Sequence, residues 1–187
     1  MRDPARFRLK RSDSVLLLID VQERLSAVMD PVAFAAALVN LRRWVEGAQV
    51  LGVPIVWTEQ YVKGLGPTVA PLREVLPVGL QPIEKLMFSC CGVEPVRAAL
   101  RGKGQVIAVG METHVCVFQT VRDLEEQGVK TFVPADAVIS RAEGNKALAL
   151  DLMRQLGTTV TSTEMGLFDL TERAGTEEFR KVSKLVK

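Results

Sequence analysis

The sequence predicts one α/β domain, a Rossmann-like three-layer α/β/α sandwich around a mostly parallel sheet. Short apolar runs alternate along the chain with longer segments of helical periodicity, which is typical of consecutive βαβ units. The runs are apolar on both faces, as in strands that helices cover on both sides. With 187 residues, 48% of them hydrophobic, the chain fits a single domain over 1–187, with a core at about 13–170 and a C-terminal helix at about 176–187.

The first half of the chain opens with the clearest of these runs, 15–19, which ends at Asp20. Asp30 followed by a proline is a helix start signal, and apolar residues then recur at helical spacing until a glycine. A long Gly- and Pro-rich stretch follows the second apolar run, and loops of that length in a compact domain are usually functional. The predicted elements are a strand at 15–19, a helix from 31 to Gly52, a strand at 53–58 and a loop at 59–82 with at most a short helix.

The second half repeats the alternation, and glycines mark the expected helix ends. The predicted elements are a short strand at 83–88, a helix at 93–100, a strand at 105–109, a helix at 116–127, a strand at 129–133, a helix at 143–156 and a strand at 158–161. In such sheets ligands bind beyond the carboxyl ends of the strands. We therefore expect the site where Asp20, Thr58 and Gly110 emerge.

Composition and charge argue against several classes of partner. The formal net charge is only +2, and no segment carries a dense Lys/Arg run, so we do not expect a nucleic-acid partner. The first ten residues lack the apolar centre of a secretory signal, and no stretch approaches the length of a membrane span. We expect a cytoplasmic protein that does not associate with membranes.

Three residues that could carry chemistry fall on the predicted sheet edge: Asp20, Lys85 and Cys116. Cys116 is expected at the start of a helix, where unpaired N–H groups, the helix dipole and a nearby lysine favour a thiolate. The same N–H groups could bind the oxyanion formed when sulfur attacks a carbonyl, with Asp20 as general base. The alternative interpretation is a packed cysteine and a carboxylate that caps a turn.

Several motifs in order resemble the isochorismatase-like hydrolase superfamily, over roughly residues 13 to 170. They are Leu-Leu-Leu-Ile-Asp-Val-Gln at 16–22, Lys85, and Gly-Met-Glu-Thr-His-Val-Cys-Val at 110–117. The chain is most similar to the branch called isochorismatase domain-containing proteins, through Thr-Glu-Gln-Tyr at 58–61, Lys-Gly-Leu-Gly-Pro-Thr at 63–68, Ala-Asp-Ala at 135–137 and Ser140-Arg141.

The resemblance implies a six-stranded parallel sheet and a catalytic triad of Asp20, Lys85 and Cys116 that works through a thioester intermediate. It also implies a cis peptide between Met111 and Glu112, in a turn whose N–H groups, with that of Cys116, would face an oxyanion. Members of the superfamily commonly form dimers or tetramers, so we expect a homo-oligomer.

The chain departs from nicotinamidase-type relatives, which hold a metal with an Asp-x-His pattern after the second strand. Here that position reads Thr-Glu-Gln-Tyr, and the single histidine, His114, lies in the nucleophile turn. One imidazole does not make the usual first-row metal site. We expect no catalytic metal, no cofactor and no nicotinamide specificity, and no base role for His114; Cys90 and Cys91 are expected to be structural.

The segments that would line a pocket carry hydrogen-bonding and aromatic residues: Gln22, Glu59, Gln60, Tyr61, Phe88, Glu112 and Thr113. They suit a small-molecule substrate with a polar amide group, although Tyr61 and Phe88 could instead be core or interface packing. The leading hypothesis is a metal-independent cysteine hydrolase acting on a C–N bond. The alternatives are vinyl-ether hydrolysis of the isochorismatase type, which would need Asp20 but not Cys116, and a catalytically silent scaffold.

Overall fold

The computed structural model describes residues 4–187, so the first three residues of the predicted domain lie outside the described part of the chain. Its centre is a parallel sheet in the order β3-β2-β1-β4-β5-β7, and a short strand, β6, also pairs with β4. The strands are β1 (Ser14–Ile19), β2 (Ile55–Gln60), β3 (Ile83–Lys85), β4 (Gln105–Met111), β5 (Lys130–Pro134), β6 (Val138–Ile139) and β7 (Thr159–Thr161). The predicted α/β sandwich is confirmed, with β6 in addition to the six expected strands.

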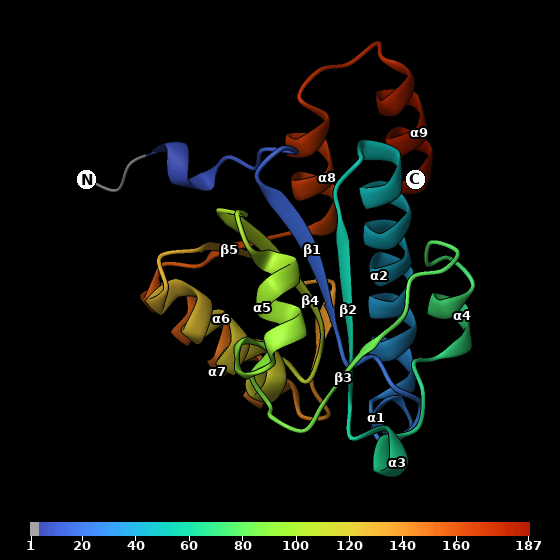
Figure 1. Ribbon diagram of the computed structural model, residues 1–187. Helices are drawn as coiled ribbons and strands as arrows, with labels where there is room; N and C mark the ends of the chain where they lie inside the picture. The colour runs from blue at the N-terminus through green and yellow to red at the C-terminus, as the bar shows by residue number, and fades with distance from the viewer. Residues whose placement is uncertain (1–3) are drawn as a thin grey trace.

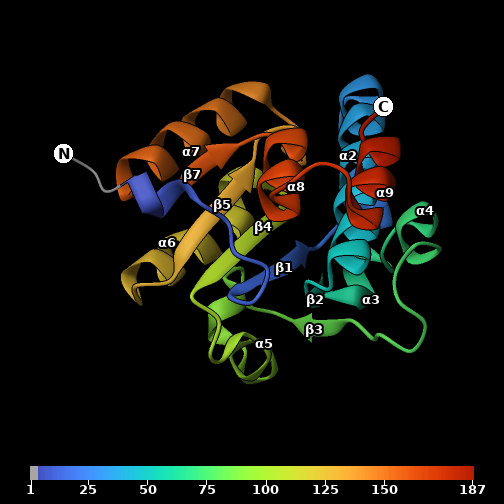
Figure 2. The same cartoon turned by 90° about the horizontal axis from the view of Figure 1, so that it is seen from above.

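Helices cover both faces of the sheet (Figure 1). Seen from above in Figure 2, α5, α6 and α7 lie on one face, and α2, α8 and α9 lie on the other. The helices are α1 (Glu23–Ser26), α2 (Pro31–Leu51), α3 (Val62–Leu65), α4 (Ala70–Arg73), α5 (Glu94–Leu100), α6 (Phe118–Glu126), α7 (Glu143–Leu156), α8 (Thr163–Thr171) and α9 (Glu177–Leu185). Short helical turns η1 (Pro4–Phe7), η2 (Cys90–Gly92) and η3 (Thr113–Val117) complete the set.

The central strand β1 divides the core in two. Leu16 and Leu18 pack into the cluster beneath α2, which contains Trp44. Val15, Leu17 and Ile19 face the other cluster, beneath α5, α6 and α7. Successive side chains of a strand point to opposite faces, so an uninterrupted apolar run is what a strand covered on both sides requires. The two cores fix β1, and with it the position of the residue that follows, Asp20.

Strong local signals placed α2 and α7 correctly. Asp30 Oδ1 accepts a hydrogen bond of 2.8 Å from the N–H of Ala33, and Gly52 ends α2 in the left-handed region with φ 69°. Helix α7 runs from Glu143 to Leu156 and ends at Gly157, which also has positive φ. Capping and a glycine end are determined by neighbouring residues alone, so they can be predicted from sequence.

Other boundaries differ from the prediction. The second strand begins at Ile55 rather than at residue 53, and the predicted strand 83–88 ends at Lys85. The predicted loop 59–82 contains two single-turn helices, α3 and α4. Strand β6 and helix α8 were missed, and the predicted helix 116–127 begins with the π-helical turn η3 and continues as α6. The C-terminal helix is confirmed as α9.

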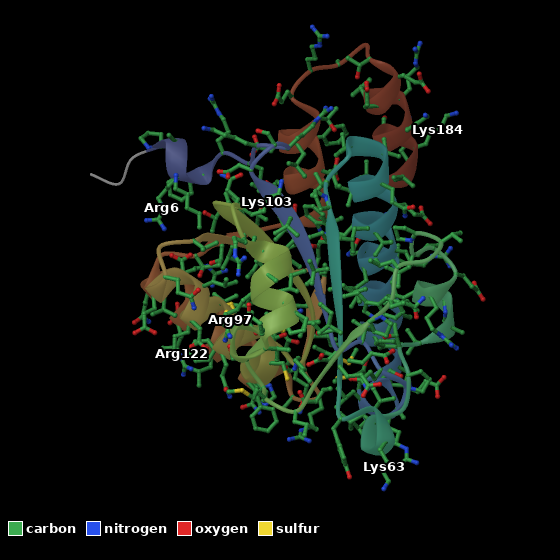
Figure 3. All side chains as sticks on the ribbon, in the orientation of Figure 1. Arg6, Lys63, Arg97, Lys103, Arg122 and Lys184 are labelled. Atoms are coloured by element: carbon green, nitrogen blue, oxygen red, sulfur yellow. The ribbon has the colours of Figure 1, made fainter. Side chains whose placement is uncertain are left out.

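The structure shows how basic side chains are distributed and whether any helix could span a membrane. Figure 3 shows the labelled basic side chains spread over segments as far apart as η1 and α9, rather than gathered on one element. Between residues 4 and 187, no helix combines the length and the hydropathy that crossing a bilayer requires.

Candidate active site

Three predicted residues meet at the carboxyl edge of the sheet, the lower end in Figure 1 where α1 and α3 lie. Asp20 directly follows β1, Lys85 ends β3, and Cys116 lies in η3 directly after β4. Asp20 is 0% exposed, Lys85 4% and Cys116 5%. Parallel strands bring their carboxyl ends together, which explains why residues so far apart in sequence become neighbours. We call these three residues the buried cluster.

Asp20 is the centre of the buried cluster. Its Oδ2 lies 2.6 Å from the Nζ atom of Lys85, and its Oδ1 accepts a hydrogen bond of 2.8 Å from Oγ1 of Thr58 in β2. Its backbone is in the left-handed region, φ 52°, and its N–H donates to the carbonyl of Thr58 at 3.2 Å. A non-glycine residue in that region is uncommon, so β1 and β2 together hold Asp20 in this orientation.

Lys85 is held by acceptors on several sides. Besides Asp20, its Nζ donates to Oε1 of Gln60 at 2.8 Å and to the carbonyls of Phe88 at 3.1 Å and Met87 at 3.2 Å. Burial opposes the charge, but the negative charge of Asp20 and the nearby thiols outweigh it, so the pKa of Lys85 lies above its usual value. Lys85 is therefore an ammonium ion throughout the physiological range.

Cys116 is a neutral thiol at rest. Burial raises its pKa, the negative charge of Asp20 raises it further, and the positive charge of Lys85 only partly offsets both, while a hydrogen bond to Asp20 also favours the thiol. The expectation of a thiolate favoured by a helix start and a lysine is therefore wrong. Cys116 lies within the π-helical turn rather than at the first position of an α-helix, and the buried carboxylate is its neighbour.

The turn that carries Cys116 is built from closely packed backbone. Gly110 has φ 118°, and a Cβ atom there would lie 2.1 Å from the carbonyl oxygen of Ile19. The peptide bond between Met111 and Glu112 is cis. The carboxylate of Glu112 accepts a hydrogen bond of 3.0 Å from the N–H of Arg141, and its carbonyl accepts from Val115 and Val117. The role of Glu112 is therefore to anchor the turn to the segment after β6.

The side chains of two predicted pocket residues form hydrogen bonds with the backbone at the end of β2 and in the loop that follows. The side-chain amide of Gln22 bonds to both the N–H and the carbonyl of Gln60, at 2.7 and 2.9 Å, and also to the carbonyl of Gly66 at 2.6 Å. Glu59 Oε1 accepts from the N–H of Thr68 at 2.6 Å. These hydrogen bonds of Gln22 and Glu59 fix the loop, and contact of the two residues with a substrate stays a prediction.

The remaining predicted pocket residues divide into buried and exposed. Gln60 is buried and bonded to Lys85, and the Oγ1 atom of Thr113 is buried with no hydrogen-bond partner among residues 4–187. Tyr61 and Phe88 are each 52% exposed, so neither is a core residue. A cavity of about 190 Å³ lies beside Tyr61, lined by Tyr61, Val62, Lys63, Glu84, Lys85 and Leu86. The hydroxyl of Thr113, which has no partner among the described residues, can still form a hydrogen bond.

The larger cavities lie elsewhere. One of about 690 Å³ borders β7 and α8, and another of about 700 Å³ lies along residues 8–12. Neither is lined by a member of the buried cluster. His114 points to Oγ of Ser140, with Nδ1 at 3.0 Å, so it is not a partner of Cys116. In the part of the chain that the structure describes, no group of three or more His, Cys, Asp and Glu side chains could hold a metal ion.

Sequence reasoning missed two residues beside the buried cluster. Thr58 was expected at the sheet edge but was given no role, and Cys90 was expected to be only structural. The Cys90 Sγ atom lies 3.9 Å from Oγ1 of Thr58, which in turn bonds to Asp20. The signal for Thr58 was its place at a strand end next to the strand of Asp20. Nothing local predicted the contact of Cys90, because it depends on how the segment after Lys85 turns back.

Fold and site together define the class: a doubly wound parallel α/β protein whose polar cluster is assembled at the carboxyl ends of its strands. The model of the Isochorismatase domain matches residues 14–165. The chain therefore belongs to the isochorismatase domain family.

Relatives match over nearly the whole chain. Isochorismatase domain-containing protein 2 of Danio rerio is 37% identical over 182 residues, which covers 96% of this chain and 89% of the relative. The secreted isochorismatase effector Isc1 of Phytophthora sojae is 37% identical, covering 96% and 87%. A solved structure of MAR1 ribonuclease from Caenorhabditis elegans is 35% identical with a TM-score of 0.90, covering 96% of this chain and 92% of that one. The predicted family is confirmed.

Proposed function

We propose that the protein is a metal-independent cysteine hydrolase that cleaves the C–N bond of a small amide-like substrate. One observation carries the proposal: a single buried carboxylate, Asp20, is in contact with both a cation, Lys85, and a thiol, Cys116. A thiol beside a carboxylate can lose its proton at the moment of attack, and a fixed cation balances the charge of the site.

The proposed reaction runs in two halves. In the first, Asp20 takes the thiol proton as the sulfur of Cys116 attacks the carbonyl carbon. The protonated Asp20 then gives that proton to the leaving nitrogen, the C–N bond breaks, and a thioester remains. In the second half, Asp20 takes a proton from water, the hydroxide attacks the thioester, and the acid leaves as Cys116 regains its proton. Lys85 stays charged throughout.

The charged oxygen of each tetrahedral intermediate needs hydrogen-bond donors. The proposed donors are backbone N–H groups of the turn Met111–Glu112 and of Cys116, because this turn carries the nucleophile itself. The free hydroxyl of Thr113 could bind a polar group of the substrate. The near-complete burial of the cluster favours a small substrate, which would pass the exposed rings of Tyr61 and Phe88.

The further expectations from the sequence become part of this proposal. We propose that the protein works in the cytoplasm, as a dimer or tetramer of identical chains, on a small molecule, and without a metal or cofactor. The location and the oligomeric state are independent of the cysteine mechanism, so either could be wrong while the mechanism holds.

A panel of small primary amides and carbamoyl compounds tests the activity, with Cys116→Ala, Cys116→Ser and Asp20→Asn beside the wild type. Turnover should fall on the order of 10⁴-fold in Cys116→Ala and in Asp20→Asn, and mass spectrometry should find an acyl group on Cys116 in the wild type. Vinyl-ether hydrolysis that survives in Cys116→Ala but not in Asp20→Asn would favour the isochorismatase-type alternative. Failure of every substrate together with no adduct would favour the silent scaffold.

A second candidate is hydrolysis of RNA, which the name of the Caenorhabditis elegans relative suggests. It runs against the expectation from charge that nucleic acid is not a partner. Incubation of purified protein with end-labelled RNA decides it: cleavage that disappears in Asp20→Asn, and not in a matched preparation of an exposed variant away from the site such as Lys184→Met in α9, would support it.

A further inference from the structure

Two side chains beside the buried cluster are not used by the proposed reaction. Thr58 and Cys90 are both 0% exposed. Oγ1 of Thr58 donates to Oδ1 of Asp20 at 2.8 Å, and the Sγ atom of Cys90 lies 3.9 Å from the same Oγ1. Cys90 is itself fixed, because its N–H donates to Oγ1 of Thr120 in α6 at 2.9 Å. Three polar groups thus lie in a line from η2 through β2 to the end of β1.

The direction of the two hydrogen bonds follows from counting protons. A hydroxyl has one proton, and that of Thr58 points to the carboxylate, which can only accept. Thr58 must therefore accept in its contact with Cys90, so Cys90 is the donor and is a thiol. Burial raises the pKa of Cys90 to about 11, with Lys85 opposing and Asp20 adding to the shift, which agrees with that assignment.

We propose that Thr58 is a positioning residue for Asp20, and that Cys90 completes a hydrogen-bonded line, Cys90 to Thr58 to Asp20, which holds the carboxylate toward Cys116. The inference rests on the proposed function, since Asp20 is the proposed base. Cys90 and Cys116 then have different roles in one site: Cys90 keeps its proton for a hydroxyl, and Cys116 yields its proton to the carboxylate.

Both oxygens of the Asp20 carboxylate are held, Oδ2 by Lys85 and Oδ1 by Thr58. Together they prevent rotation of the group. Without the hydroxyl, the charge on Oδ1 is left uncompensated in a buried site and opposes a second negative charge on Cys116 more strongly. The ionisable groups that face Cys116 are Asp20 after β1, Lys85 in β3 and Cys90 in η2.

The test is the pH profile of Cys116 alkylation by iodoacetamide, with the adduct located by mass spectrometry. In Thr58→Val, which keeps the shape and removes the hydroxyl, the profile should move to higher pH, and the rate at a fixed pH on its rising part should fall about tenfold. Thr58→Ser restores the hydroxyl and should recover the wild-type profile. Cys90→Ala should give a profile at higher pH than Cys90→Ser, because both variants lack the ionisable thiol and only the serine can still donate to Thr58.

The matched control is Thr131→Val in β5, another buried threonine whose hydroxyl donates to a carboxylate, Oε1 of Glu125 in α6, away from the buried cluster. It should leave the Cys116 profile unchanged. If Thr58→Val does not fold, Thr58→Ala removes the same hydroxyl without a bulky replacement.

Identical Cys116 profiles in the wild type and Thr58→Val, complete lack of reaction in both included, would overturn the role of Thr58. Identical profiles in Cys90→Ala and Cys90→Ser would overturn that of Cys90. Alkylation needs no substrate, so it separates this inference from the proposed function: a protein with the expected Thr58 shift but no acyl adduct and no turnover would retain the positioning line and refute the hydrolase.

Discussion

At the scale of single residues, Lys85 and Asp20 form a buried ion pair in the site. Both side chains are 0% exposed and 2.6 Å apart. Removing one member of such a pair leaves a buried charge without a partner, which typically costs about 3–5 kcal/mol. The ion pair therefore stabilises the carboxyl edge of the sheet, in addition to its role in the proposed chemistry.

Lys85→Met should lower the free energy of unfolding by about 3–5 kcal/mol, measured by urea denaturation at neutral pH. The double variant with Asp20→Asn should lose less than the sum of the two single variants. The exposed pair of Lys181 and Glu177 is the control, and Lys181→Met should leave stability unchanged.

Because folding raises the pKa of Lys85, the contribution of its charge to the free energy of unfolding is full below the usual lysine value of 10.5. It declines as pH rises through the pKa of the folded state.

The resting state of Cys116 leads to a prediction with an unusual sign. The charge of Asp20 and its hydrogen bond both raise the pKa of Cys116, so Asp20→Asn should move Cys116 alkylation to lower pH while it abolishes turnover. Cys91 is an internal control, because its raised pKa comes first from burial and does not involve Asp20. A loss of Cys116 reactivity in Asp20→Asn at every pH would contradict the neutral-thiol resting state.

At the scale of elements, the contact between β1 and β4 depends on the absence of a side chain at one position. Gly110 pairs with Ile19 in the register of the two strands, has positive φ, and has no room for a Cβ atom. A substitution there strains the backbone and forces the strands apart directly beneath the turn that carries Cys116.

Gly110→Ala should therefore destabilise the protein by roughly 3 kcal/mol or more, with a matching fall in the midpoint of thermal unfolding. Gly144→Ala in α7 is the matched control, because a Cβ atom there meets nothing within 4 Å. Alanine favours helices over glycine by up to about 1 kcal/mol, so this variant should be neutral or slightly more stable. Equal losses in the two variants would disprove the close-contact explanation.

Elements with a strong local signal could be predicted, and those that depend on tertiary contacts could not. The apolar run of β1 and the ends of α2 and α7 are determined by residues that are neighbours in the sequence. Helix α8 was missed because its buried face includes the non-apolar Thr163 and Thr171 while the apolar Met165 is 66% exposed, so its apolar residues do not form one stripe. Strand β6 has two residues and exists only through its pairing with β4.

The site shows the same division. Asp20, Lys85 and Cys116 could be placed at one edge of the sheet because parallel strands end together. Their protonation states could not, because the balance between burial, Asp20 and Lys85 at Cys116 depends on packed distances. The commitment of Gln22 and Glu59 to the loop likewise depends on where the chain turns after β2.

At the scale of the whole molecule, one helix presents an apolar stripe outward. Leu148, Leu152 and Leu156 of α7 are 60%, 37% and 44% exposed and recur at a spacing of four, which places them on one side of the helix. Isolated apolar side chains on a surface are ordinary, but an aligned stripe is typical of an interface. We expect this stripe to be a contact between two copies of the chain.

Light scattering after size exclusion should give two or four times the chain mass of 20.5 kDa, and Leu152→Glu should increase the fraction of monomer. Val32→Glu is the control, since Val32 is 79% exposed at the start of α2 and lies outside the stripe. A monomeric wild type would refute the expected oligomer, and a dimer unaffected by Leu152→Glu would place the interface elsewhere.

The division of the core by β1 has a consequence for motion. Strand β1 is shielded from water by apolar layers on both sides, so its amide protons can exchange with solvent only when the whole domain opens. Leu86, Met87 and Phe88, just across the site, have their carbonyls bonded to Gln60 and Lys85 but are largely exposed, and exposed side chains change rotamer rapidly. The proposed base would therefore sit on one of the slowest parts of the molecule and face side chains that move fast. A substrate could be admitted by movement on one side of the site while the geometry of the reacting groups is kept on the other.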